Sequence, residues 1–144
     1  MSYRVLVVDD DRDVREVLRN LLTMKGYEVV AAEDGMTAVA SVAKYHPDLM
    51  ILDVSMPRMS GFQTCQAIRK MKGNDQIPVV FLSAKKSEQD KKYGERIGGD
   101  VYVTKPYNQN ELLLIVERLL RQRARPDEDR EDLDQVRDDT SWVD

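Results

Sequence analysis

The sequence predicts an α/β protein in which five parallel strands form an open, doubly wound sheet with helices on both faces. Five short runs rich in Val, Ile and Leu recur along the chain. Each run is nearly continuous rather than alternating, which is typical of parallel strands that are buried on both faces. Segments with helical spacing of apolar residues lie between the runs. This regular alternation implies right-handed crossovers between neighbouring parallel strands.

Each predicted element can be placed along the chain. The predicted strands are Val5–Val8, Val29–Ala32, Leu49–Leu52, Val79–Leu82 and Val101–Val103. The predicted helices cover residues 14–26, 36–45, 61–73, 87–99 and 108–123. Ser60 and Gln63 have capping-box spacing before the third helix, as do Asn108 and Glu111 at the fifth. Five strands connected in this way fit the flavodoxin-like order 2-1-3-4-5.

Length and composition limit the kind of protein this can be. The chain has 144 residues, about the length of one typical domain. Cys65 is the single cysteine and His46 the single histidine, which excludes an internal disulfide and any site that needs two histidines. The first apolar run is too short to span a membrane and has no signal-peptide cleavage pattern. We therefore expect a soluble, cytoplasmic protein that has no membrane partner.

The charge of the chain changes after residue 123. Residues 124–144 contain three Arg and nine Asp or Glu, a net charge of −6, whereas residues 1–123 have a net charge of +2. Few large apolar residues lie in this last segment, and Pro126 marks its start. We expect a disordered acidic tail over residues 124–144, following one domain over residues 1–123. An acidic segment repels phosphate backbones, so we expect no direct nucleic-acid binding.

Polar side chains follow the predicted strands at their carboxyl ends. In an open parallel sheet, ligands bind beyond these ends, where the strand order reverses between the first and third strands. We therefore expect carboxylates, a hydroxyl and an ammonium group to converge at one edge of the sheet. The residues concerned are Asp9, Asp10 and Asp11 after the first strand, Asp53 after the third, Ser83 after the fourth and Lys105 after the fifth.

This grouping predicts a site for Mg²⁺ and a phosphoryl group. Carboxylates held close together repel one another, and a hard divalent cation with oxygen ligands relieves the repulsion. A carboxylate at the centre of the group can then attack a phosphoryl group and form an aspartyl phosphate. The expected roles are Asp53 as nucleophile, Asp9, Asp10, Asp53 and the Ser55 carbonyl as metal ligands, and Lys105 and Ser83 as contacts to phosphoryl oxygens.

Four stretches together resemble the receiver domain of two-component response regulators, which has the fold of the chemotaxis regulators. They are "VLVVDDD", "LMILDVSMPRMSG", "VVFLSA" and "GGDVYVTKPY", and the resemblance covers roughly residues 3–123. It implies Mg²⁺-dependent phosphorylation of Asp53 by a sensor histidine kinase or a phosphotransfer protein. It also implies slow self-catalysed dephosphorylation, so the chain would be a signalling protein and not otherwise an enzyme.

The same resemblance implies a conformational switch. Ser83 would move toward the phosphoryl group, and Tyr102, three positions before Lys105, would change rotamer. The surface that rearranges would comprise the fourth predicted helix, the fifth strand and the fifth helix, and it would control a downstream protein partner. The resemblance further implies a cis peptide bond between Lys105 and Pro106. Ser55 and Lys85, each two positions after a site residue, lie where side chains control water access to the phosphoryl group.

Several alternatives remain open from sequence. The chain ends soon after the last predicted helix, so we expect a stand-alone receiver that has no DNA-binding output domain; a receiver fragment of a longer regulator is the alternative. The pair Asp9 and Asp11 would also suit a haloacid-dehalogenase-type phosphohydrolase, but that leaves Asp53 unexplained. A flavin module is disfavoured because no Gly-rich phosphate loop follows the first strand. The sequence does not define the oligomeric state.

Overall fold

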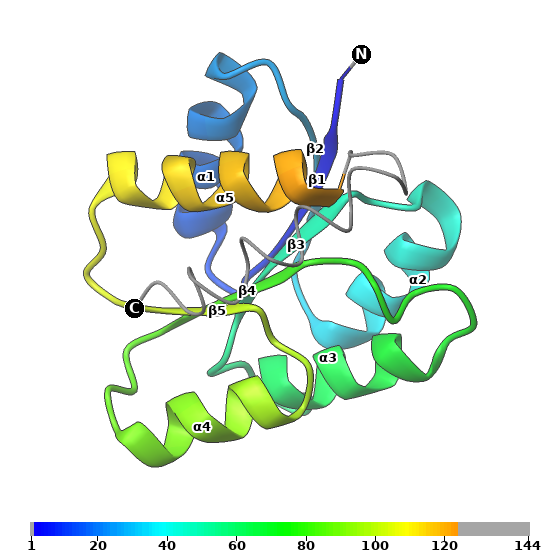
Figure 1. Ribbon diagram of the computed structural model, residues 1–144, viewed down its shortest axis with the longest axis vertical. Coiled ribbons are helices and arrows are strands. Elements are labelled where there is room, and N and C mark those ends of the chain that lie inside the picture. The colour runs from blue at the N-terminus through cyan, green and yellow to red at the C-terminus, as the bar shows by residue number, and fades with distance from the viewer. Residues whose placement is uncertain (1, 124–144) are drawn as a thin grey trace.

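Five parallel strands form a single sheet in the order β2-β1-β3-β4-β5, which confirms the predicted fold class (Figure 1). The computed structural model describes residues 2–123, so the acidic tail predicted over residues 124–144 lies outside the described part. Neighbouring strands pair in register, with Val8 opposite Ala32 on one side and Leu52 on the other. The strands are β1 (Arg4–Val8), β2 (Glu28–Ala32), β3 (Leu49–Asp53), β4 (Val79–Ser83) and β5 (Val101–Thr104).

Helices cover both faces of the sheet and make three layers (Figure 1). One face is covered by two helices, and the other by three. The first pair is α1 (Arg12–Met24) and α5 (Gln109–Arg123); the second group is α2 (Gly35–Tyr45), α3 (Gly61–Lys70) and α4 (Glu88–Arg96). None of these helices, within the described residues, is long and apolar enough to cross a membrane.

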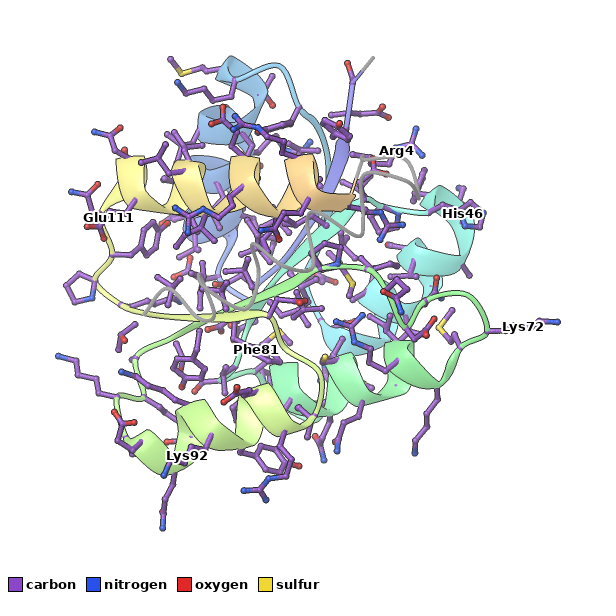
Figure 2. The ribbon with its side chains drawn as sticks, viewed as in Figure 1. Arg4, His46, Lys72, Phe81, Lys92 and Glu111 are labelled. Carbon is purple, nitrogen blue, oxygen red and sulfur yellow. The ribbon has the colours of Figure 1, made fainter. Side chains whose placement is uncertain are left out.

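Two hydrophobic cores lie between the layers, one on each face of the sheet. Alternate strand residues point to opposite faces, so both sets are buried and the strands read as continuous apolar runs. Leu6, Leu52 and Phe81 face α2, α3 and α4, while Val7 and Ile51 face α1 and α5. In Figure 2 the labelled Phe81 lies between the sheet and α4. The sheet is thereby fixed from both sides, which gives its carboxyl edge a rigid base.

Capping side chains set where the helices begin. The predicted box at α3 is present: the Ser60 hydroxyl accepts from the Gln63 backbone N–H, and the Gln63 side chain accepts from the Ser60 N–H. At α5, the Asn108 side chain accepts from the Glu111 N–H at 3.1 Å. The third helix ends at Lys70 rather than at residue 73, because Met71 already has an extended backbone.

Three strands extend one residue beyond their predicted ends, and these extra residues lie at the carboxyl edge. Asp53 pairs with Leu82, and Ser83 pairs with Thr104, as regular members of the sheet. Residues inside a pleated ladder have fixed side-chain directions. Asp53 and Ser83 are therefore oriented by the sheet rather than by a loop.

We expect Ser60→Ala to lower the free energy of unfolding by about 1 kcal/mol, because the first turn of α3 loses its cap. Urea denaturation monitored by circular dichroism measures the change. Thr23→Ala, at an exposed position near the end of α1, is the control and should stay within about 0.5 kcal/mol of the parent. Equal stability of Ser60→Ala and the parent would contradict the assignment of this cap.

Candidate functional site

Three carboxylates meet at the carboxyl ends of β1 and β3. One oxygen each from Asp9, Asp10 and Asp53 lies within 4.8 Å of the other two, and we call these residues the acidic cluster. Asp9 is 2 % exposed and Asp53 6 % exposed, whereas Asp10 is exposed to solvent. The sheet thus brings together residues that lie more than forty positions apart in the sequence, as the switch-point argument predicts.

Backbone contacts fix the loop that carries Asp9. Its N–H donates to the Ala32 carbonyl of β2 at 3.2 Å, and its carboxylate accepts from the Asp11 N–H at 2.9 Å. Asp11 turns away from the acidic cluster and caps α1, with its side chain accepting from the Asp13 N–H at 2.9 Å. The phosphohydrolase alternative needs Asp11 as a general acid, whereas in the structure its carboxylate caps α1 and is not part of the acidic cluster.

Lys105 connects the acidic cluster to the end of β5. Its ammonium Nζ lies 3.3 Å from an Asp53 carboxylate oxygen and 3.4 Å from an Asp9 oxygen. The peptide bond between Lys105 and Pro106 is cis, as predicted. The Lys105 N–H donates to the Ser83 carbonyl at 2.7 Å, so the chain beyond β5 stays alongside β4. One positive charge is therefore shared between two buried negative ones.

The electrostatic balance of the site favours neutralisation of its carboxylates. Burial, followed by the negative charge of Asp9, raises the pKa of Asp53 from 3.8 to about 6, although Lys105 acts in the opposite direction. Burial also raises the pKa of Asp9. Burial works against the charged form of Lys105, but Asp9 and Asp53 outweigh it and raise the Lys105 pKa. The ammonium group of Lys105 thus offsets only part of the negative charge of Asp9 and Asp53.

The two serines predicted for the site occupy different environments. Ser83 is fully buried at the end of β4, and its hydroxyl oxygen accepts from the Lys85 N–H at 3.0 Å. Ser55 lies in the loop after β3, and its side chain is exposed. Ser83 therefore lies beside Asp53 in the sheet, one strand away, whereas Ser55 lies in the loop two residues after Asp53.

Tyr102 joins β5 to the loop that follows Ser83. Its hydroxyl donates to the Lys85 carbonyl at 2.9 Å, and burial raises the pKa of the phenol. The Tyr102 ring lies 6.4 Å from the Phe81 ring and 6.5 Å from the Phe62 ring, measured between centroids. The predicted switch residues Ser83 and Tyr102 thus both contact Lys85, one through its N–H and the other through its carbonyl.

Sequence reasoning missed two contacts that shape the site. Arg15, on the first turns of α1, donates to the Asp9 carbonyl at 2.8 Å. Gly61 packs so closely on β3 that a Cβ atom there would lie 2.2 Å from the Asp53 carbonyl oxygen. The four-residue spacing of Arg15 from Asp11 points to a contact with Asp11, so the contact with Asp9 had no signal in the sequence. The close packing of Gly61 on β3 follows only from the three-dimensional path of the loop after β3.

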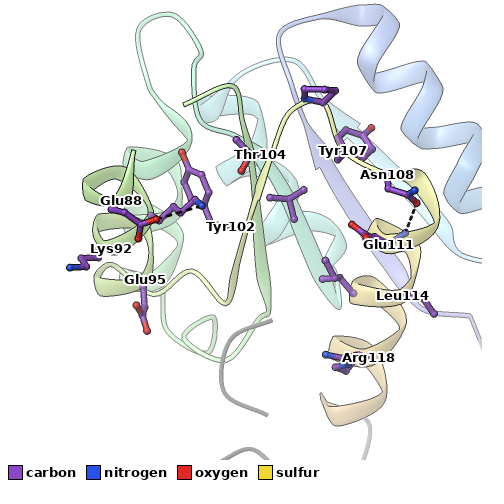
Figure 3. Close-up of a pocket in the computed structure, with 14 residues that line it drawn as sticks. Glu88, Lys92, Glu95, Tyr102, Thr104, Tyr107, Asn108, Glu111, Leu114 and Arg118 are labelled. Carbon is purple, nitrogen blue, oxygen red and sulfur yellow. Dashed lines mark hydrogen bonds and ion pairs between the residues drawn. The ribbon is translucent and has the colours of Figure 1, made fainter. Parts of the chain in front are cut away.

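A groove runs between α4, β5 and α5 on the adjacent surface (Figure 3). Its volume is about 560 Å³, and we call it the α4–β5–α5 groove. Glu88, Lys92 and Glu95 border it from α4, with Tyr102 on β5 and Leu114 on α5. Leu114 is 60 % exposed, so an apolar side chain is available there to a partner. The surface predicted to rearrange therefore contains a concave feature next to Tyr102.

Comparisons with known proteins identify the family. A family model described as the response regulator receiver domain matches residues 5–117. The chain is 47 % identical over 112 residues to an uncharacterized transcriptional regulatory protein, YrkP, of Bacillus subtilis, covering 78 % of this chain and 47 % of that protein. It is 42 % identical over 128 residues to the response regulator MprA of Mycobacterium bovis, covering 89 % of this chain and 54 % of that protein.

Solved structures agree with this assignment. The chemotaxis protein CheY4 of Vibrio cholerae superposes with a TM-score of 0.79 at 34 % identity, covering 83 % of this chain and 99 % of that one. The fold and its acidic edge define a receiver domain, a signalling domain of two-component systems. The chain belongs to the response regulator receiver family, in which phosphorylation and Mg²⁺ binding are general features. It spans about half the length of the curated relatives named above.

We expect Asp53→Asn to stabilise the metal-free protein at neutral pH. The folded-state pKa of Asp53, about 6, lies above its ordinary value of 3.8, so between these values the folded chain binds more protons than the unfolded chain. The wild-type free energy of unfolding therefore falls by about 1–3 kcal/mol as pH rises through this range. The variant avoids this loss, because an asparagine side chain does not ionise.

Urea denaturation in EDTA, at acid and at neutral pH, measures this difference. Asp75→Asn, at an exposed carboxylate outside the acidic cluster, is the control and should follow the wild type at both pH values. A stability difference between Asp53→Asn and wild type that does not grow with pH would contradict the electrostatic account.

Proposed function

We propose that Asp53 accepts a phosphoryl group and that the resulting aspartyl phosphate controls the surface around α4, β5 and α5. The observation that carries the proposal is the buried Asp53 carboxylate, 3.3 Å from the Lys105 ammonium, within the acidic cluster. A carboxylate held at the centre of a charged site, at the carboxyl edge of this sheet, is placed for attack on phosphorus.

The donor set fits a hard divalent cation. Oxygens of Asp9, Asp10 and Asp53 converge within 4.8 Å of one another, and a single Lys105 leaves them with excess negative charge. Mg²⁺ prefers such oxygens and retains several waters, so two or three carboxylates and the Ser55 carbonyl suit it. When bound, Mg²⁺ neutralises charge on carboxylate and phosphoryl oxygens.

The chain's own residues carry the transfer. An Asp53 carboxylate oxygen forms a bond to phosphorus while the bond from phosphorus to the donor nitrogen or oxygen breaks, and the leaving group keeps the electron pair. Lys105, already at hydrogen-bonding range of Asp53, moves its ion pair to a phosphoryl oxygen. The Ser83 hydroxyl, on the neighbouring strand, donates to another phosphoryl oxygen after a small movement.

The same contacts couple the site to the surface. The Ser83 hydroxyl accepts a hydrogen bond from the Lys85 N–H. When this hydroxyl turns toward the phosphoryl group, the hydrogen bond is lost or shifted, and the loop after β4 moves. Tyr102 holds the Lys85 carbonyl from β5, and its ring packs on Phe81. Phosphorylation thereby biases a packing element that has two arrangements, which is how a local charge changes a distant surface.

The donor and the output are proposed from the family. Members exchange phosphoryl groups with sensor histidine kinases or phosphotransfer proteins, and we propose the same cytoplasmic partners here, with a downstream protein bound at the α4–β5–α5 groove. A stand-alone receiver without direct nucleic-acid binding stays a prediction. The longer-regulator alternative gains support from YrkP, which is described as a transcriptional regulatory protein. The mass of the protein isolated from its natural cells distinguishes a stand-alone receiver from a longer regulator.

We expect acetyl phosphate and Mg²⁺ to add one phosphoryl group to the wild type, measured by intact-mass spectrometry. Asp53→Asn should gain none, and EDTA should abolish the adduct, because the metal offsets repulsion between the cluster and the incoming phosphate. Asp75→Asn, which leaves the acidic cluster intact, should be labelled like the wild type. An adduct of equal size on Asp53→Asn would contradict the proposal.

A further inference from the structure

Arg69, on the last turn of α3, joins two loops at the edge of the sheet opposite the acidic cluster. Its guanidinium donates to the Ile77 and Gly98 carbonyls, each at 2.6 Å, and to the Asn74 carbonyl at 3.0 Å. It also lies 3.5 Å from the Asp100 carboxylate. We call this set of contacts the Arg69 clamp. The side chain is 15 % exposed, so the contacts form largely out of water.

The Arg69 clamp holds the C-terminal end of α4. Gly98 lies in the turn that leaves α4, with a φ of 105°, and a Cβ atom there would lie 2.9 Å from the Arg69 Nε. Asp100, two residues after Gly98, is fixed as well, because its carboxylate accepts from the Val79 N–H at 2.8 Å and its N–H donates to the Val79 carbonyl at 2.8 Å. The end of α4 is thus tied to α3 and to the start of β4.

The body of α4 is attached far less firmly. Of its nine residues only Gly94 is buried, against the edges of the Phe81 and Phe62 rings. Tyr93, which is 38 % exposed, packs edge-on against the Phe62 ring with the centroids 5.0 Å apart. Its N-terminal end follows the loop held by Ser83 and Tyr102 through the two backbone groups of Lys85. A helix held at its middle by one buried glycine and one partly exposed ring relies on its ends for much of its position, since little apolar area holds its middle.

We propose that Arg69 is a positioning residue for the switch and that α4 turns about a pivot made by the Arg69 clamp. The C-terminal end of α4 stays fixed while the Ser83–Lys85 loop moves the N-terminal end. Rotation about one fixed end converts a small displacement at Lys85 into a directed change along the α4 side of the α4–β5–α5 groove. This inference rests on the proposed phosphorylation of Asp53, since that event supplies the displacement.

The test is hydrogen–deuterium exchange of the full chain with Mg²⁺, with and without beryllofluoride as a stand-in for the phosphoryl group. In the wild type we expect the change to concentrate at residues 84–91, while residues 95–100 stay protected in both states. In Arg69→Lys, which keeps a positive charge but loses the planar set of donors, residues 95–100 should exchange at least about tenfold faster in both states. The beryllofluoride effect at residues 84–91 should fall by about half or more, because the helix has lost its pivot.

Arg96→Lys is the matched control, since Arg96 lies exposed on α4 itself and its replacement should leave both patterns unchanged. Unchanged exchange in Arg69→Lys would overturn the inference. So would a wild type in which residues 95–100 exchange as fast as residues 84–91, a measurement that needs no variant to fold. Acetyl phosphate labelling of the same samples separates the pivot from the proposed function. Absence of label on the wild type overturns the proposed function. Normal labelling together with unaltered hydrogen exchange in Arg69→Lys overturns only the pivot.

Discussion

The whole arrangement depends on the repulsion between buried carboxylates at the ends of β1 and β3, which one lysine compensates only in part. Asp9 and Asp53 are almost fully buried, and Lys105 lies within 3.4 Å of both. Burying two like charges against one cation is unfavourable, and burial accordingly raises the pKa of Asp53. The rest of the fold stabilises this site: two apolar cores hold the sheet rigid so that the carboxylates cannot separate.

The same imbalance underlies the chemistry and the control that we propose for the site. A pocket with excess negative charge favours a divalent cation, and a bound cation would make the pocket receptive to a phosphoryl group. Neutralising or adding charge there would act on Ser83, at the end of the neighbouring strand β4, and on Lys105, which directly follows β5. Because Ser83 accepts from the Lys85 N–H and Tyr102 donates to the Lys85 carbonyl, a change in charge at the site would, in the proposed switch, become a change in the backbone position of Lys85.

Sequence alone predicted the fold and the residues of the acidic cluster, because both follow from strand order. Parallel strands share an edge, so Asp53 and Lys105 had to converge once the order 2-1-3-4-5 was inferred. Contacts that a long side chain makes with distant loops were not predictable from the sequence. Arg69 at a helix end reads as an ordinary basic residue near the negative end of a dipole, and nothing in the spacing reveals its three carbonyl partners. The close approach of Gly61 to Asp53 likewise depends on a loop path.

If the charge of the acidic cluster is incompletely compensated, a divalent cation that binds there should complete the compensation and stabilise the folded state. Urea denaturation of the wild type at neutral pH, in millimolar Mg²⁺ and in EDTA, tests it most directly. A bound cation should raise the midpoint in Mg²⁺, because ligand binding stabilises the folded state, and the rise should vanish in the double variant Asp10→Asn with Asp53→Asn. An unchanged wild-type midpoint, or an equal rise in the double variant, would contradict the account.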